Sequence, residues 1–185
     1  MELTDFEALS SDCYGTLSDW ETGIAAVLGP WAKRCELNLE QEQLFEAYAA
    51  HEARVELEHP TELYPHILAR TFRPLGEELG VRVGDEDAAA LARSVPEWPA
   101  FEDSHDALVL LGQRFKPIIL SNVGPASFAG SGPRLGVEFT SVLTAEDVGL
   151  YKPSPQTSTR FWPCSIPRSC SARIEVPISR PGRYS

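Results

Sequence analysis

The residues FEALSSDCYGTL, at positions 6–17, decide the fold expected for this chain. Their first part mixes apolar and small residues over a length typical of a buried strand, and the run stops at the turn residues Tyr14, Gly15 and Thr16. Asp12 therefore stands at the carboxyl end of the expected strand. A carboxylate held there by turn amides can act as a nucleophile, or it can simply cap the turn. The local sequence leaves both interpretations open.

A helical block follows this first strand. Residues 19–92 have the apolar period of amphipathic helices, with side chains recurring at offsets of three and four. Turn signals predict that the block is divided into several helices, at Gly29-Pro30, at His59-Pro60 and across 80–84.

Two further strands are predicted at 116–120 (KPIIL) and 139–143 (FTSVL), with an amphipathic helix over 103–115. Strands that alternate with helices predict an α/β fold with a doubly wound, Rossmann-like parallel sheet. Ligands of such sheets gather at the carboxyl ends of the strands, where Asp12 and the pair Ser121-Asn122 stand. The helical block would then be a cap inserted after the first strand.

The composition changes beyond Lys152. Residues 153–185 contain six prolines, seven serines and five arginines, but a single acid, Glu175. They show no sustained period, so we expect an irregular, disordered tail and a sheet that is incomplete at the C-terminus. The predicted division is a core of 1–18 and 96–152, a cap of 19–95 and a tail of 153–185. The abrupt change also suggests the hypothesis that the segment from Gln156 is translated in another reading frame.

Composition excludes some classes of function. A net charge of −11 over 185 residues argues against a nucleic-acid partner, which requires clustered Lys and Arg. No run approaches the ~18 apolar residues of a membrane span, and the acidic start has no signal-peptide pattern. Four cysteines at these spacings form neither a disulfide framework nor a zinc motif. We therefore expect a cytoplasmic protein that acts on a small molecule, and a homodimer remains open.

The polar groups that follow the later strands are weak signals individually. Ser121 and Asn122 can bind an anionic group or stabilise developing charge, but turn chemistry explains them equally well. Lys152 would keep a neighbouring carboxylate ionised, although most such lysines are surface residues.

Their order along the chain is more specific. DCYGTL at 12–17, LSN at 120–122 and YKP at 151–153 resemble the first three motifs of the haloacid dehalogenase superfamily. The stretches at 9–20 and 144–155 are particularly similar to its type II haloacid dehalogenase branch, and the resemblance covers roughly residues 3–155. It implies a hydrolase that cleaves the carbon–halogen bond of a small 2-haloacid, an acid substrate, through an aspartyl ester, with no metal and no cofactor.

The resemblance also assigns roles to single residues. It makes Asp12 the nucleophile, Thr16 the hydroxyl that orients it and Lys152 the catalytic lysine. Ser121 and Asn122 form the second motif and, with Tyr14, would contact the substrate. Phosphatases of the superfamily have an acidic proton donor at the Tyr14 position, and a phenol with a pKa near ~10 cannot replace it at neutral pH.

The chain also departs from the family. The substrate-binding arginine has no clear counterpart; Arg54 and Arg70 are candidates by region only, while Tyr64 is a candidate for the cavity wall or the core. The acidic fourth motif is not found after Pro155. Two alternatives therefore stay open: a hydrolase of another small substrate, such as a phosphate ester, and a non-catalytic, truncated remnant.

Overall fold

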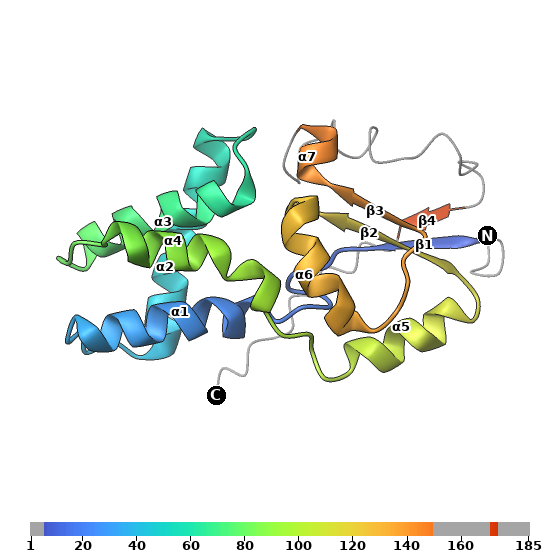
Figure 1. The fold of residues 1–185 in the computed structure, drawn as a ribbon, viewed down its shortest axis with the longest axis horizontal. Helices are drawn as coiled ribbons and strands as arrows, with labels where there is room; N and C mark the ends of the chain where they lie inside the picture. The colour runs from blue at the N-terminus through green and yellow to red at the C-terminus, as the bar shows by residue number, and fades with distance from the viewer. Residues whose placement is uncertain (1–5, 150–170, 174–185) are drawn as a thin grey trace.

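The computed structural model describes residues 6–149 and 171–173, and within them it has an α/β fold with a Rossmann-like parallel sheet (Figure 1). The sheet consists of β1 (Ala8–Ser11), β2 (Lys116–Ser121), β3 (Ser141–Thr144) and β4 (Ser171–Arg173). Its strand order is β3-β2-β1-β4, and every neighbouring pair is parallel. Three helices belong to this part of the molecule: α5 (Ser104–Gly112), α6 (Pro125–Leu135) and α7 (Ala145–Val148).

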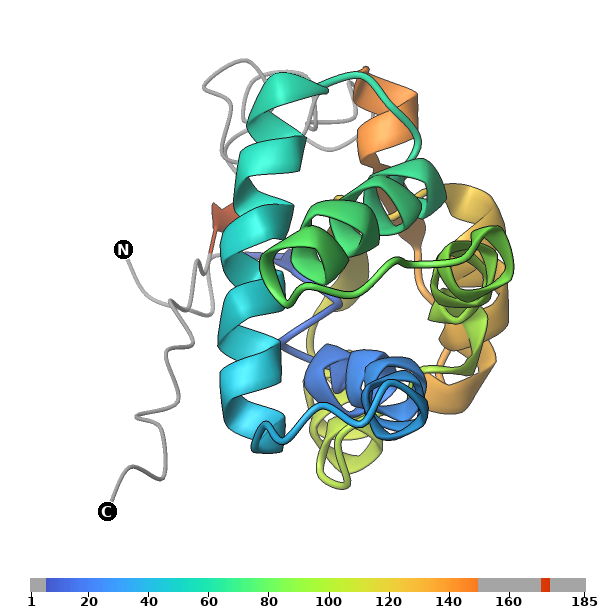
Figure 2. The ribbon, with the colours of Figure 1, turned by 90° about the vertical axis from the view of Figure 1, so that its left-hand side faces the viewer.

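Four helices between β1 and β2 form a separate body beside the sheet, which we call the helical unit (Figures 1 and 2). Its core is built from fully buried aliphatic and aromatic side chains, and the rings of Trp31 and Phe72 meet edge to face at 4.8 Å. A short 3-10 helix, Val95–Glu97, leads from this unit towards α5. The helices are α1 (Trp20–Arg34), α2 (Gln41–Glu58), α3 (Tyr64–Glu78) and α4 (Asp85–Arg93).

The strands β1, β2 and β3 confirm the three predicted strands, and α5 lies within the predicted helix. The predicted break at Gly29-Pro30 is wrong, because α1 continues through both residues to Arg34. Pro30 removes one backbone hydrogen bond, but Leu28 and Trp31 on either side of it are almost completely buried. Burial of this apolar face outweighs the local cost of the proline.

The expectation of an irregular tail is wrong for residues 171–173. They form β4, which pairs with β1 in parallel, so that Ala8 lies opposite Ser171 and Ser10 opposite Arg173. A parallel ladder is made by backbone groups, and the three residues of β4 include no proline that would remove a donor. The remainder of the predicted tail, with Lys152 just before it, lies outside the described residues.

The strand order reverses at β1. From β1 the chain moves outward through β2 to β3, and it returns to the opposite side of β1 to form β4. Ligand sites of open α/β sheets lie at the carboxyl ends of the strands near such a reversal. Asp12 directly follows β1, and Ser121 ends the neighbouring β2. Within the described ranges, none of the helices is both long and apolar enough to cross a membrane.

Candidate functional site

A tight turn after β1 positions Asp12. The carbonyl of Cys13 accepts the backbone amides of Thr16, Leu17 and Ser18 at 3.2, 2.7 and 2.9 Å, which closes the turn. Gly15 lies within this turn and has a φ of +87°, in the region that favours glycine. Cys13 is completely buried in the core beneath the sheet, whereas Asp12 is exposed. Successive side chains of an extended segment alternate, which turns Cys13 inward and Asp12 outward.

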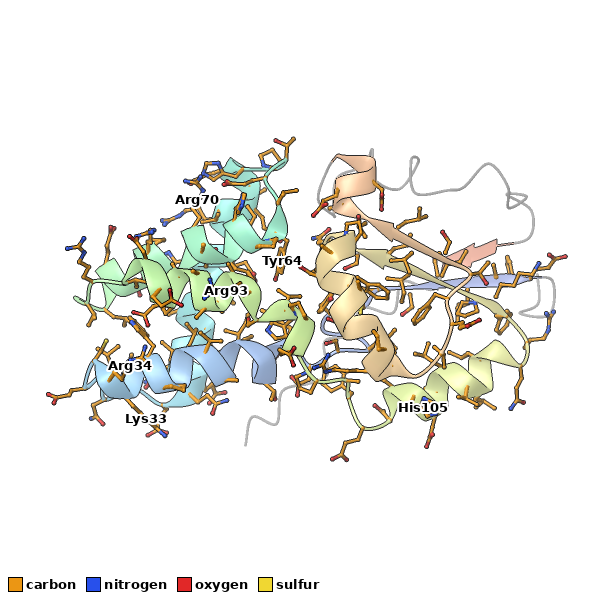
Figure 3. All side chains as sticks on the ribbon, in the orientation of Figure 1. Lys33, Arg34, Tyr64, Arg70, Arg93 and His105 are labelled. Carbon is orange, nitrogen blue, oxygen red and sulfur yellow. The ribbon has the colours of Figure 1, made fainter. Side chains whose placement is uncertain are left out.

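Asp12 lines a cavity of about 170 Å³ between the carboxyl ends of β1 and β2 and the helical unit. Tyr14, Ser121 and Asn122 line the same cavity, so the structure brings together four residues that the sequence singled out. Figure 3 shows Tyr64 on the side of the helical unit that faces the sheet. The lining residues are Asp12, Tyr14, Trp20, Glu52, Glu56, Tyr64, Ser121, Asn122 and Val123.

Tyr14 presents its ring to this cavity, because its hydroxyl is engaged elsewhere. That hydroxyl donates to Ser131 Oγ on α6 at 2.9 Å, and Ser131 in turn donates to the carbonyl of Val95 at 3.0 Å. The ring also meets Trp98 edge to face, with 5.6 Å between centroids. Burial raises the pKa of Tyr14 far above its usual value. Tyr14 therefore contributes its ring to the cavity wall and keeps its phenol proton at neutral pH.

The second motif forms a turn at the end of β2. Ser121 is completely buried, and its Oγ accepts the backbone amide of Val123 at 3.0 Å. This bond fixes the hydroxyl oxygen and leaves its hydrogen for a donor role. Asn122 is the next residue, and its side chain contributes both a donor and an acceptor to the lining.

Other candidates from the sequence are not brought to this cavity. Thr16 lines a different hollow, which is formed by β1, β2 and α5. Arg70 forms a bidentate ion pair with Glu62, in which Nε and Nη2 donate to the carboxylate at 2.9 and 3.0 Å. Arg54 Nη2 lies 3.2 Å from His51 Nδ1. Neither of these two candidates by region lines the Asp12 cavity.

Sequence reasoning missed two acidic residues of the cavity, Glu52 and Glu56 on α2. Glu52 Oε1 accepts hydrogen bonds from the hydroxyls of Tyr48, at 3.2 Å, and Tyr64, at 2.9 Å. Burial, and secondly the charge of Glu56, raises the pKa of Glu52 to about 7. The available signal was the spacing of Tyr48, Glu52 and Glu56, which places them on one helix face.

Comparison with known proteins gives a fold assignment. Neither a protein-family model nor a curated protein matches the sequence. Two L-2-haloacid dehalogenase structures match it, a defluorinating one with 19% identity and a TM-score of 0.72, and one from Xanthobacter autotrophicus with 18% and 0.71. Each match covers 84% of this chain but only 67% and 63% of those chains. A putative HAD-hydrolase from Bacillus subtilis bound to magnesium matches over 90% of this chain and 76% of its own, with 18% identity and a TM-score of 0.72. The chain thus has the fold of the haloacid dehalogenase-like hydrolases.

Proposed function

We propose that this chain is a hydrolase in which Asp12 displaces halide from a small organic halide, 2-haloacids being the class that the sequence resemblance implies. The observation that supports the proposal most directly is the location of Asp12. It follows the central strand β1, at the point where the strand order reverses, and it lines a cavity of small-molecule size. Two of the structures with this fold are L-2-haloacid dehalogenases, and another of them has chloropropionic acid covalently bound.

The proposed reaction has two steps. First, a carboxylate oxygen of Asp12 bonds to the substrate carbon while the carbon–halogen bond breaks, and halide leaves with the bonding pair. Water then attacks the carbonyl carbon of this ester, which releases the alcohol and a proton and restores the carboxylate. Ser121 and Asn122 supply polar hydrogens beside Asp12, where charge shifts during both steps.

A magnesium-dependent phosphatase is less well supported. The phosphatases of the superfamily protonate the leaving group with an acid two residues after the nucleophile. At that position this chain has Tyr14, whose pKa burial raises far above neutrality. In the described part of the chain, no group of three or more His, Cys, Asp or Glu side chains is arranged to hold a metal ion.

The test is a single-turnover reaction in water enriched in heavy oxygen. Because water attacks the ester carbonyl, the label is expected in the carboxyl group of Asp12, and mass spectrometry of the peptide that contains it would detect the label. The substrates are three organic chlorides that differ in charge: 2-chloropropionate, 2-chloropropionamide and 2-chloroethyltrimethylammonium. Absence of label and of chloride release with all three would refute the proposed function.

Replacement of the nucleophile gives a second prediction. Asp12→Asn is expected to abolish halide release, because the amide does not attack carbon, while the circular dichroism spectrum stays unchanged. Asp106→Asn is the matched control, since Asp106 is exposed on α5 and loses the same charge. Turnover by Asp12→Asn at the wild-type rate, with deamidation excluded, would assign the nucleophile to another residue.

A further inference from the structure

The wall that faces Asp12 from the helical unit is acidic. Apart from the phenols of Tyr14 and Tyr64, the ionisable side chains of the described lining are three carboxyl groups, on Asp12, Glu52 and Glu56. Among the described residues, no lysine, arginine or histidine contributes to the lining. A substrate carboxylate would therefore meet like charges in this part of the site.

Among the described residues, two neutral groups and one charged group act on Glu52 in this wall. Its carboxyl group is bound by two neutral donors, the hydroxyls of Tyr48 and Tyr64, both on Oε1. The charged group that acts on it most strongly is Glu56, which raises its pKa. The described neighbours of Glu52 thus hydrogen-bond it without neutralising its charge, and a bound cation would do so.

The remaining walls of the cavity suit such a cation. Three aromatic side chains line it: Tyr14, Trp20 and Tyr64. They are held in place by other rings, since Trp20 packs on Phe45 with centroids 4.8 Å apart, and Tyr64 on Trp98 at 6.4 Å. Aromatic faces attract organic cations, and methylated ammonium groups are recognised by pockets of this composition.

We infer that Glu52 makes the site select a substrate whose non-reacting end is a small organic ammonium group and not a carboxylate. The inference rests on the proposed function for its chemistry and names the substrate class of the same site. The ammonium group lies between Glu52 and the aromatic walls, and the carbon that carries the halogen lies at Asp12. For a 2-chloroethylammonium compound, the Asp12 oxygen–carbon bond forms, chloride leaves, and water releases the 2-hydroxyethylammonium product and one proton.

Binding alone tests the inference without turnover. The probe is tetramethylammonium, titrated into the full chain by calorimetry at about pH 6 and about pH 8. The titratable groups that face Glu52 are Tyr48 and Glu56 on its own helix, Tyr64 on α3 and Asp12 across the cavity. Because the tyrosines stay neutral in this pH range, we expect Glu52 to control the change in tetramethylammonium affinity. Affinity should rise with pH as Glu52 ionises.

Substitutions then identify the residue responsible. Glu52→Gln should weaken tetramethylammonium binding by about tenfold and remove its pH dependence, whereas Glu52→Asp should retain both. Glu46→Gln, on an exposed position of the same helix, is the matched control and should bind as the wild type does. Equal affinity in Glu52→Gln and wild type would overturn the inference, as would a preference of the same site for Mg²⁺ over tetramethylammonium.

Turnover separates this inference from the proposed function. The inference requires a higher kcat/KM for 2-chloroethyltrimethylammonium than for 2-chloropropionate, and a reversal or loss of that preference in Glu52→Gln. If Asp12 is labelled only with 2-chloropropionate, the proposed function stands and the inference fails. If the probe binds through Glu52 but no chloride compound labels Asp12, the site is an ammonium site and the proposed reaction fails.

Discussion

At the scale of single residues, Gly23 is the position in α1 that admits the ring of Trp98. A Cβ at Gly23 would lie 2.3 Å from two atoms of that ring, which is 1% exposed and has no room to retreat. Trp98 contacts both Tyr14 and Tyr64, which line the cavity. Close packing at Gly23 therefore fixes two aromatic walls of the site indirectly.

Gly23→Ala is expected to lower the free energy of unfolding by about 1–3 kcal/mol through overpacking. Gly29→Ala is the control in the same helix, because no atom beyond its chain neighbours and the helix backbone lies within 4 Å of its added Cβ. There the helix propensity of alanine opposes the restriction that Pro30 places on the preceding residue, so stability should change by less than about 1 kcal/mol. Urea unfolding of both variants measures the difference, and equal effects would show that Trp98 moves without cost.

At the scale of elements, the start of α1 is fixed by its N-cap. Asp19 accepts the backbone amide of Thr22 at 3.0 Å through Oδ1 and the hydroxyl of the same threonine at 2.7 Å through Oδ2. The next residue, Trp20, is the first of the helix and lines the cavity. The cap therefore links the stability of α1 to the shape of the site.

Asp19→Ala is expected to cost about 1 kcal/mol of stability, because the amide of Thr22 loses its acceptor. Asp19→Asn retains an acceptor and should remain within a few tenths of a kcal/mol of the wild type. Thermal unfolding followed by circular dichroism would compare the two. A loss as large in Asp19→Asn as in Asp19→Ala would mean that charge, and not capping, stabilises this end.

The site residues that follow strands could be predicted from the sequence, whereas those placed by the packing of helices could not. Asp12, Ser121 and Asn122 could be predicted because each follows an apolar run, and the carboxyl ends of parallel strands meet at one edge. Glu52 could not, because its place depends on how α2 packs against α3 and on how the helical unit lies beside the sheet. The course of α1 through Pro30 was missed for a similar reason, since tertiary burial overrode a local signal.

At the scale of the whole molecule, Glu52 makes stability depend on pH. Its pKa is 4.5 as an ordinary side chain and about 7 in the folded protein, chiefly because burial disfavours the charged form. Between these values the folded state holds a proton that the unfolded state has released, so stability falls as pH rises through this window. The loss amounts to at most about 3 kcal/mol.

Glu52→Gln should remove this component while keeping an acceptor for Tyr48 and Tyr64. The variant is therefore expected to gain stability relative to the wild type as pH rises from about 5 to about 8, by roughly 1–3 kcal/mol. Urea unfolding at both pH values measures the gain. A difference between the two proteins that does not change with pH would contradict the shifted titration of Glu52.

The strand order has a consequence for the time course of folding. Ala8 pairs with Lys116 on one side and with Ser171 on the other. Both partners of β1 are therefore far from it along the chain. The helical unit, which lies between β1 and β2 in the sequence, is held together mainly by contacts among consecutive helices. We expect it to form in the early phase of refolding. Closure of the sheet around β1 spans long loops and should be the slow phase. Asp12, at the tip of β1, would then enter its final surroundings only in the last kinetic step.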